Sequence, residues 1–194
     1  MSHYFIENPD ILTRERELRI DLFGKNLRFL TNNGLFSCDK IDDASLMLVQ
    51  NMPPITGTLL DLGCGYGFIG IALAIANSII LTQSDINSLA LSYAKKNAQR
   101  NNITANQIHS NSFENIPSTF DNIVLNPPIH AGKSIMYRLY EDSANALNTG
   151  GSLFICHTKK TWSGIHIKKV VRTLHKLRNT TQKTWLLCNT MREI

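Results

Sequence analysis

The chain has 194 residues, of which 43% are hydrophobic and 18% charged, a composition typical of one well-buried globular domain. No apolar stretch approaches the roughly 20 residues that cross a bilayer, and the N-terminus lacks a basic region followed by an apolar core. We therefore expect neither a membrane protein nor a secreted one. The four cysteines are widely spaced and form no C-x-x-C pair, which argues against a zinc site or a disulfide framework and favours a reducing cytoplasm.

The net charge of +5 is unevenly distributed along the chain. Residues 157–194 carry a net charge of +8, which leaves −3 for the first 156 residues. A basic end on a slightly acidic body indicates a polyanionic partner, with RNA as the first candidate. A solvated charged helix face would give the same pattern, and charge alone does not separate the two interpretations.

The first forty residues predict a β-hairpin. Residues 17–22 alternate polar and apolar as a half-buried strand does, residues 24–26 form a turn, and residues 27–30 form the second strand. A helix is predicted over residues 42–52, with Asp42 or Asp43 near its N-cap.

From Thr58 onward, predicted strands alternate with predicted helices. The strands cover residues 58–61, 79–84, 107–109, 121–126 and 151–156, and the helices cover residues 68–76, 87–101, 134–147 and 164–177. This order predicts βαβ units and a parallel sheet that is covered on both faces. Two extended pieces close the chain, residues 180–184 and 185–189, and no helix fits between them, so we expect the last pair of strands to be antiparallel. The simplest organisation is a single domain over residues 1–194, with a hairpin extension (1–40) and an α/β core (41–194).

A glycine-rich turn ends the first strand of the alternating series. Residues 61–67 read Asp-Leu-Gly-Cys-Gly-Tyr-Gly, which is neither the G-x-G-x-x-G dinucleotide spacing nor a Walker loop, since no Lys-Ser/Thr follows. Glycines allow positive φ and let a ligand approach the backbone, and the helix that follows supplies unpaired N–H groups. Alone, such a turn is weak evidence for a cofactor site.

Polar residues end the next strands as well. Asp85 ends the second strand, where its carboxylate could accept ribose hydroxyls or could act as an N-cap for the helix from Asn87. Asn111 follows the third strand, where it could bind an adenine amino group or be an ordinary turn residue. Because ligands of such folds bind outside the carboxyl ends of the strands, these tips together predict a nucleotide-like cofactor at this edge.

Asn126, Pro127 and Pro128 follow the fourth strand. The prolines fix φ and carry no N–H, so they stop the strand and leave backbone carbonyls free. An Asn amide beside a rigid carbonyl suits an exocyclic –NH2 group, which indicates an enzyme that modifies an amino nitrogen. A simple strand stop is the alternative, and His130 is either a loop residue or a catalyst.

The glycine-rich turn, the acid that ends strand two and the Asn-Pro-Pro after strand four resemble the class I S-adenosylmethionine-dependent methyltransferases. Within them, Asn-Pro-Pro-Ile-His-Ala-Gly-Lys at residues 126–133 is similar to the corresponding run of the RsmC-like ribosomal RNA guanine-N2 methyltransferases. Residues 4–9, 33–37 and 41–42 extend the likeness to short single-domain members. The resemblance implies a Rossmann-like fold, with a mostly parallel seven-stranded sheet whose last strand is antiparallel. It also implies S-adenosylmethionine as cofactor, no metal, and ribosomal RNA or a ribosomal subunit as partner of a cytoplasmic monomer or homodimer.

The resemblance also implies a role for each matching position. Those beside the cofactor are Asp42, Ser45, Asp61, Gly63, Cys64, Gly65, Gly67, Asp85, Ile86, Asn111 and Ser112. Those in catalysis are Asn126, Pro127, Pro128 and His130, and those for RNA are Ile129, Lys133, Lys159 and Lys160.

Three positions depart from the family pattern. Ile129 stands where the family has a Phe that stacks on the target base, Asn111 where it usually has Asp, and Ala44 where it has Gly. These departures keep open a degenerate methyltransferase that binds RNA as a module. Methylation of adenine N6 or of a protein glutamine is the other alternative. An NAD-dependent oxidoreductase is less well supported, given the glycine spacing.

Overall fold

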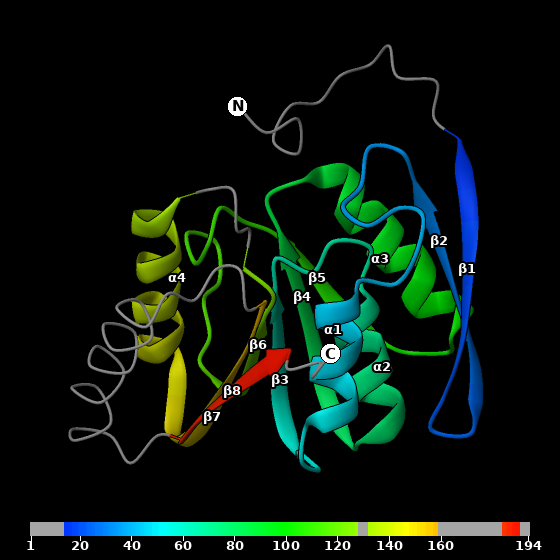
Figure 1. The fold of residues 1–194 in the computed structure, drawn as a ribbon. Helices are drawn as coiled ribbons and strands as arrows, with labels where there is room; N and C mark the ends of the chain where they lie inside the picture. Colours follow the sequence, from blue (N-terminus) through cyan, green and yellow to red (C-terminus); the bar gives the residue numbers. More distant parts are fainter. Residues whose placement is uncertain (1–13, 128–131, 159–183, 191–194) are drawn as a thin grey trace.

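The computed structural model of the protein describes residues 14–127, 132–158 and 184–190. In this part of the chain the main sheet consists of β3 (Gly57–Leu62), β4 (Ile79–Asp85), β5 (Ala105–His109), β6 (Phe120–Leu125), β7 (Leu147–Thr158) and β8 (Thr184–Thr190). The strands follow the order β5-β4-β3-β6-β7-β8, and every neighbouring pair is parallel (Figure 1). The predicted α/β class with a parallel sheet is therefore confirmed.

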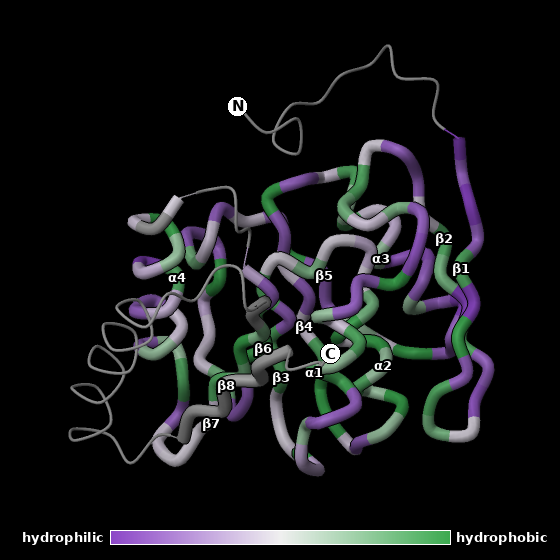
Figure 2. Tube along the Cα trace, in the orientation of Figure 1, coloured by the Kyte–Doolittle hydropathy of each residue, from purple (hydrophilic) through white to green (hydrophobic). Residues whose placement is uncertain are grey.

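Helices cover both faces of this sheet. Helices α1 (Asp43–Asn51), α2 (Phe68–Ala76) and α3 (Ser88–Arg100) lie on one face, and α4 (Lys133–Asn145) lies on the other (Figure 1). Every residue of α2 except Gly70 is apolar, and Figure 2 shows the hydrophobic colour continuing from α2 into the central strands. No helix within the described ranges is both long and apolar enough to cross a bilayer.

A hydrophobic core lies on each face of the sheet. Leu59 packs with Phe29, Leu48 and Ile71 under the first three helices, whereas the next residue, Leu60, packs with Tyr140 of α4. This alternation follows from the two-residue period of a strand, which turns successive side chains to opposite faces.

The N-terminal hairpin, β1 (Glu15–Leu22) and β2 (Lys25–Asn32), forms a separate antiparallel sheet and docks on α3. Two asparagines of α3 make this contact. The Asn97 side chain accepts from Leu30 N at 2.7 Å and donates to Leu30 O at 2.8 Å, and Asn101 does the same with Arg28 at 3.1 and 2.8 Å. Four helical residues rise about 6 Å and two strand residues rise about 6.7 Å. The two amides therefore match the spacing of β2 and take the place of a neighbouring strand.

The expectation of a seven-stranded sheet with an antiparallel last strand is wrong for the described residues, whose main sheet has six strands, all parallel. Residues 184–190 run as one strand, so the expected break between residues 184 and 185 is absent. The connection over residues 159–183 exceeds the dozen or so residues that a parallel crossover needs. The expected helix over residues 164–177 lies outside the described residues.

Candidate functional site

The predicted strand-tip residues meet at the carboxyl edge of the main sheet. In the strand register, Leu62 of β3 is level with Ser84 of β4 and with Leu125 of β6. The residues that follow these three, Gly63, Asp85 and Asn126, therefore start from the same level of the sheet.

The three glycines of the turn serve two different purposes. Gly63, Gly65 and Gly67 all have positive φ, at 67°, 56° and 92°. A Cβ added to Gly63 or Gly65 would meet no atom within 4 Å, whereas one on Gly67 would lie 2.7 Å from Gln83 Nε2. Gly63 and Gly65 thus leave open space beside the backbone, as a cofactor cradle requires, and Gly67 allows close packing.

A buried carboxylate completes the start of α2. The N-cap residue, Gly67, has no side chain to offer, and Asp61 Oδ2 instead accepts from Gly70 N at 2.9 Å. Burial raises the pKa of Asp61 to about 7, the charge of Asp85 adds to the rise, and the hydrogen bonds from Gly70 and Gln83 oppose it. Asp61 therefore stabilises the start of α2, directly after the turn, by binding the backbone of the helix.

Asp85 holds the glycine-rich turn from the neighbouring strand. Its Oδ2 accepts from Gly65 N at 2.8 Å and its Oδ1 accepts from Asn87 N at 2.9 Å, and the residue is 2% exposed. The N-cap of α3 is Asn87, which accepts from the N–H groups of Leu89 and Ala90. The N-cap interpretation of Asp85 is wrong, because the N-cap of α3 is Asn87, and the Asn87 N–H that Asp85 binds precedes the helix.

Two further turn positions differ in exposure. Ile86 is 38% exposed, which is unusual for a large apolar side chain at a strand tip. Cys64 is buried, and burial raises the pKa of its thiol, so it is uncharged and needs only to be small.

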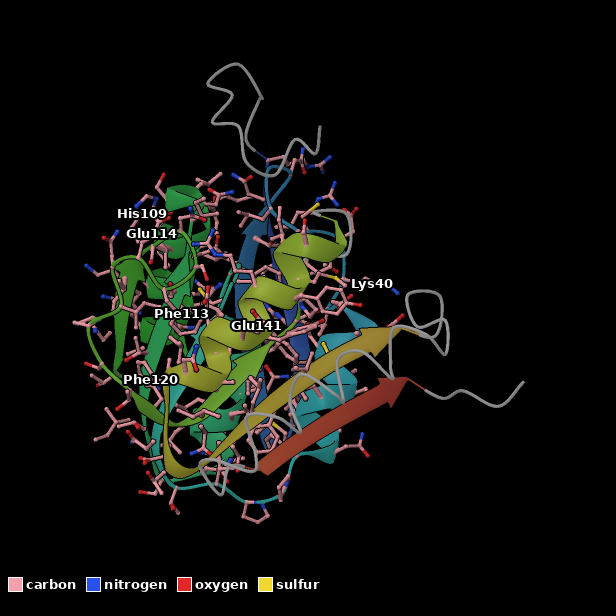
Figure 3. All side chains as sticks on the ribbon, turned by 90° about the vertical axis from the view of Figure 1, so that its left-hand side faces the viewer. Lys40, His109, Phe113, Glu114, Phe120 and Glu141 are labelled. Carbon is pink, nitrogen blue, oxygen red and sulfur yellow. The ribbon has the colours of Figure 1, made fainter. Side chains whose placement is uncertain are left out.

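Asn111 and Ser112 follow β5 at the same edge. Asn111 is exposed, and its Nδ2 donates to Glu114 Oε1 at 2.8 Å. Ser112 has a φ of 54°, and its Oγ is buried without a hydrogen-bond partner in the described part of the chain. Figure 3 shows Glu114 and His109 near each other at the β5 side, with Lys40, just before α1, on the other side of α4.

Asn126 is held by α1, which is distant in sequence. Its Nδ2 donates to Asp42 Oδ2 at 3.0 Å and to Ser45 Oγ at 2.8 Å. Asp42 is the N-cap of α1 and also accepts from Ser45 N at 2.8 Å and Ser45 Oγ at 3.0 Å. The structure thus brings Asp42 and Ser45, expected beside the cofactor, into direct contact with the residue expected to bind the amine.

The remaining candidates are only partly described. Pro127 is buried beside Asn126, and Lys133 is the first residue of α4. Five other candidates lie outside the described residues: Pro128, Ile129, His130, Lys159 and Lys160.

The sequence interpretation missed two buried amides that hold the turn. Gln83 in β4 donates to Gly67 O at 3.4 Å, and Asn97 in α3 donates to Tyr66 O at 2.8 Å; both side chains are fully buried. A polar residue at a core position of an otherwise apolar strand or helix face was the available signal.

Comparisons with known proteins agree with this geometry. The model of the methyltransferase small domain family matches residues 26–186. The chain is 34% identical over 175 residues to the uncharacterized protein YbxB of Bacillus subtilis, covering 87% of each protein. It is 37% identical over 134 residues to ribosomal RNA small subunit methyltransferase C of Aeromonas hydrophila, covering 66% of this chain and 39% of that protein.

A solved structure extends the likeness to the fold. The T. thermophilus 16S rRNA N2 G1207 methyltransferase RsmC, in complex with AdoMet and guanosine, superposes with a TM-score of 0.68 at 27% identity, covering 75% of this chain and 42% of that one. The chain therefore belongs to the methyltransferase small domain family, within the class I S-adenosylmethionine-dependent methyltransferases. It spans about two fifths of the length of these RsmC relatives.

Proposed function

We propose that the protein transfers a methyl group from S-adenosylmethionine to an exocyclic amine, and that this amine is guanine N2 in ribosomal RNA. The observation that carries the proposal is the orientation of Asn126. With Nδ2 bound to Asp42 and Ser45, the atom that the side chain presents to a ligand is Oδ1, an acceptor suited to an amino hydrogen. The RsmC names of the relatives support guanine in ribosomal RNA as the substrate.

The residues of the edge fit the cofactor. Open space beside Gly63 and Gly65 leaves room for its methionine end, and Asp85 and Ile86 at the tip of β4 would meet its ribose and adenine. When bound, S-adenosylmethionine supplies a methyl group on a sulfonium sulfur, which is already a good leaving group.

The protein's own task is then to position a poor nucleophile. A nucleobase –NH2 has its lone pair delocalised into the ring, and Asn126 Oδ1 with the Pro127 carbonyl would accept its two hydrogens. Holding the nitrogen in this way orients its lone pair, and such positioning can lower a barrier by roughly 7–11 kcal/mol. The Asn126 oxygen would also stabilise positive charge that develops on the nitrogen.

An RNA substrate adds two requirements. The target base must leave its stack, at a cost of a few kcal/mol, and cations must follow the phosphates, a role we assign to Lys133, Lys159 and Lys160. Affinity for small-subunit RNA should then fall steeply with salt concentration, and an unchanged affinity between low and high salt would contradict this part. We also assign the protein to the reducing cytoplasm, where ribosomes assemble, since its four widely spaced cysteines form no C-x-x-C pair.

The decisive experiment is methyl transfer from tritiated S-adenosylmethionine to unmodified small-subunit ribosomal RNA and subunits, followed by mass mapping of the labelled nucleotide. A transcript with inosine in place of the labelled guanosine is the matched control, because inosine lacks only the exocyclic amine. Label on guanosine that disappears with inosine supports the proposal. Label on adenosine or on a protein would show that guanine is not the substrate. If calorimetry shows no binding of S-adenosylmethionine, the protein is not a methyltransferase, and the RNA-binding module is the better interpretation.

The variant Asn126→Ala tests the assigned residue. It should abolish turnover while the Kd for S-adenosylmethionine stays unchanged, because the side chain meets the amine and not the cofactor. Wild-type turnover of this variant would overturn the assignment.

A further inference from the structure

In the hydrogen bonds around Asn126, the chemistry of the groups fixes which atom donates and which accepts. A carboxylate only accepts, so the amide atom that faces Asp42 Oδ2 at 3.0 Å must be the nitrogen. Ser45 Oγ donates its single hydrogen to the same carboxylate, at 3.0 Å, and therefore accepts from Asn126 Nδ2 at 2.8 Å. The chemistry of Asp42 and Ser45 therefore fixes the orientation of the Asn126 amide, with its nitrogen toward them.

The partners themselves are fixed by α1. Asp42 caps the helix by accepting from Ser45 N at 2.8 Å, and Ser45 is buried in the first turn. Ala44, Leu48 and Val49 bury this helix against the core, so its first turn cannot shift freely. The first turn of α1 therefore presents a rigid pair of acceptors to the tip of β6.

We propose that Asp42 and Ser45 are positioning residues that select an amine as the group to be methylated. They hold Asn126 with Oδ1 toward the substrate, and the charge of Asp42 beside the amide nitrogen polarises the amide so that Oδ1 becomes a stronger acceptor. With the amide reversed, the site would offer N–H donors, which suit a carbonyl oxygen and leave an amine unpaired. The inference rests on the proposed function, since it assumes that Asn126 binds the amine.

The test separates this role from a contact with the cofactor. Asp42→Asn keeps a good N-cap but no longer dictates the orientation of the Asn126 amide. We expect kcat for methylation of small-subunit RNA transcribed in vitro to fall about 100-fold, with KM and the Kd for S-adenosylmethionine unchanged. Ser45→Ala removes one acceptor of two and should lower kcat about tenfold. The free energy of unfolding of both variants serves as the control for folding.

An exchange of the two groups gives the sharper result. Asn126→Asp alone places two carboxylates together and should be nearly inactive. Combined with Asp42→Asn, it restores one amide and one carboxylate, now with a carboxylate oxygen toward the amine. The double variant should therefore turn over faster than Asn126→Asp, whereas a merely structural Asp42, or one that binds the cofactor, would make the two losses multiply.

The outcomes distinguish the two proposals. If Asn126→Ala is inactive while Asp42→Asn and Ser45→Ala match the wild type, the positioning role is overturned and the proposed function stands. If Asp42→Asn weakens cofactor binding but keeps kcat at saturation, the positioning role is also overturned. If Asn126→Ala keeps full turnover, the proposed function itself fails.

Discussion

The glycine-rich turn after β3 and the tip of β6 lie side by side at one sheet edge, but they are held in opposite ways. In the turn, neighbouring side chains bind the backbone: Asp85 binds Gly65 N and Asn97 binds Tyr66 O. At the β6 tip, the side chain of Asn126 is bound by other side chains. The turn should therefore respond to substitution mainly in stability, and the tip mainly in turnover.

The largest stability effect should come from Asp61→Asn and should depend on pH. The folded pKa of Asp61 is about 7, against an ordinary value of 3.8. Between these values the folded state binds more protons than the unfolded one, so Asp61 lowers stability as pH rises through this window. The full difference corresponds to about 4 kcal/mol.

Asp61→Asn removes this titration and keeps an acceptor for Gly70 N. Its stability relative to the wild type should therefore rise between pH 4 and pH 8, measured by urea unfolding at both values. A relative stability that is the same at both pH values would show that the pKa of Asp61 in the folded state is close to its ordinary value, and would contradict this prediction.

Asn97→Ala should destabilise the fold by about 3 kcal/mol, because it leaves the buried carbonyl of Tyr66 and the partly buried N–H and C=O of Leu30 without this partner. Chemical denaturation of the purified variant measures the loss. The comparison predicts that turnover of the folded fraction stays close to that of the wild type. A large loss of kcat with unchanged stability would contradict the expectation that substitutions around the turn act mainly on stability.

Gly67→Ala should be about 2 kcal/mol more destabilising than Gly65→Ala. Both residues have positive φ and share that backbone cost, but only at Gly67 does an added Cβ collide, at 2.7 Å from Gln83 Nε2 and 3.2 Å from Ala94 Cα. The Gly65 variant should instead bind S-adenosylmethionine more weakly, as calorimetry would show. Equal stabilities of the two variants would mean that Gln83 and α3 can shift to make room for the added Cβ.

The smallest effect should follow Asn101→Ala, at about 1 kcal/mol. Its bonds to Arg28 are exposed, so water can replace them, whereas the Asn97 side chain is fully buried. The difference between the Asn97 and Asn101 variants in the same urea titration isolates the contribution of burial. If Asn101→Ala were the more damaging, the hairpin would be anchored mainly at Arg28 and not at Leu30.

Much of the fold was accessible from local patterns in the sequence. The apolar run after the glycine-rich turn predicted a helix over residues 68–76, which is confirmed to the residue, because Gly67 and Asn77 fix its two ends. The direction of β8 was not accessible, since no turn residue marks where that strand begins and its partner depends on the long connection before it.

The location of the site could be predicted from the sequence, but only some of the contacts between its residues could. Strand tips of a parallel sheet must share an edge, so Asp85 and Asn126 could be placed together from their positions alone. The contact of Asp42 with Asn126 spans 84 residues, and an N-cap role already accounts for Asp42 locally. The local sequence pattern therefore gave no sign that Asp42 has a second partner.

Asn97 has a consequence for dynamics that reaches beyond the edge of the sheet. One amide binds both the hairpin strand β2 and the backbone of the glycine-rich turn. A ligand that orders the turn must then also favour the docked hairpin, and the two equilibria are linked reciprocally. Slower exchange of the Leu30 amide hydrogen with solvent would report that S-adenosylmethionine has bound, although Leu30 belongs to a sheet with no predicted cofactor contact.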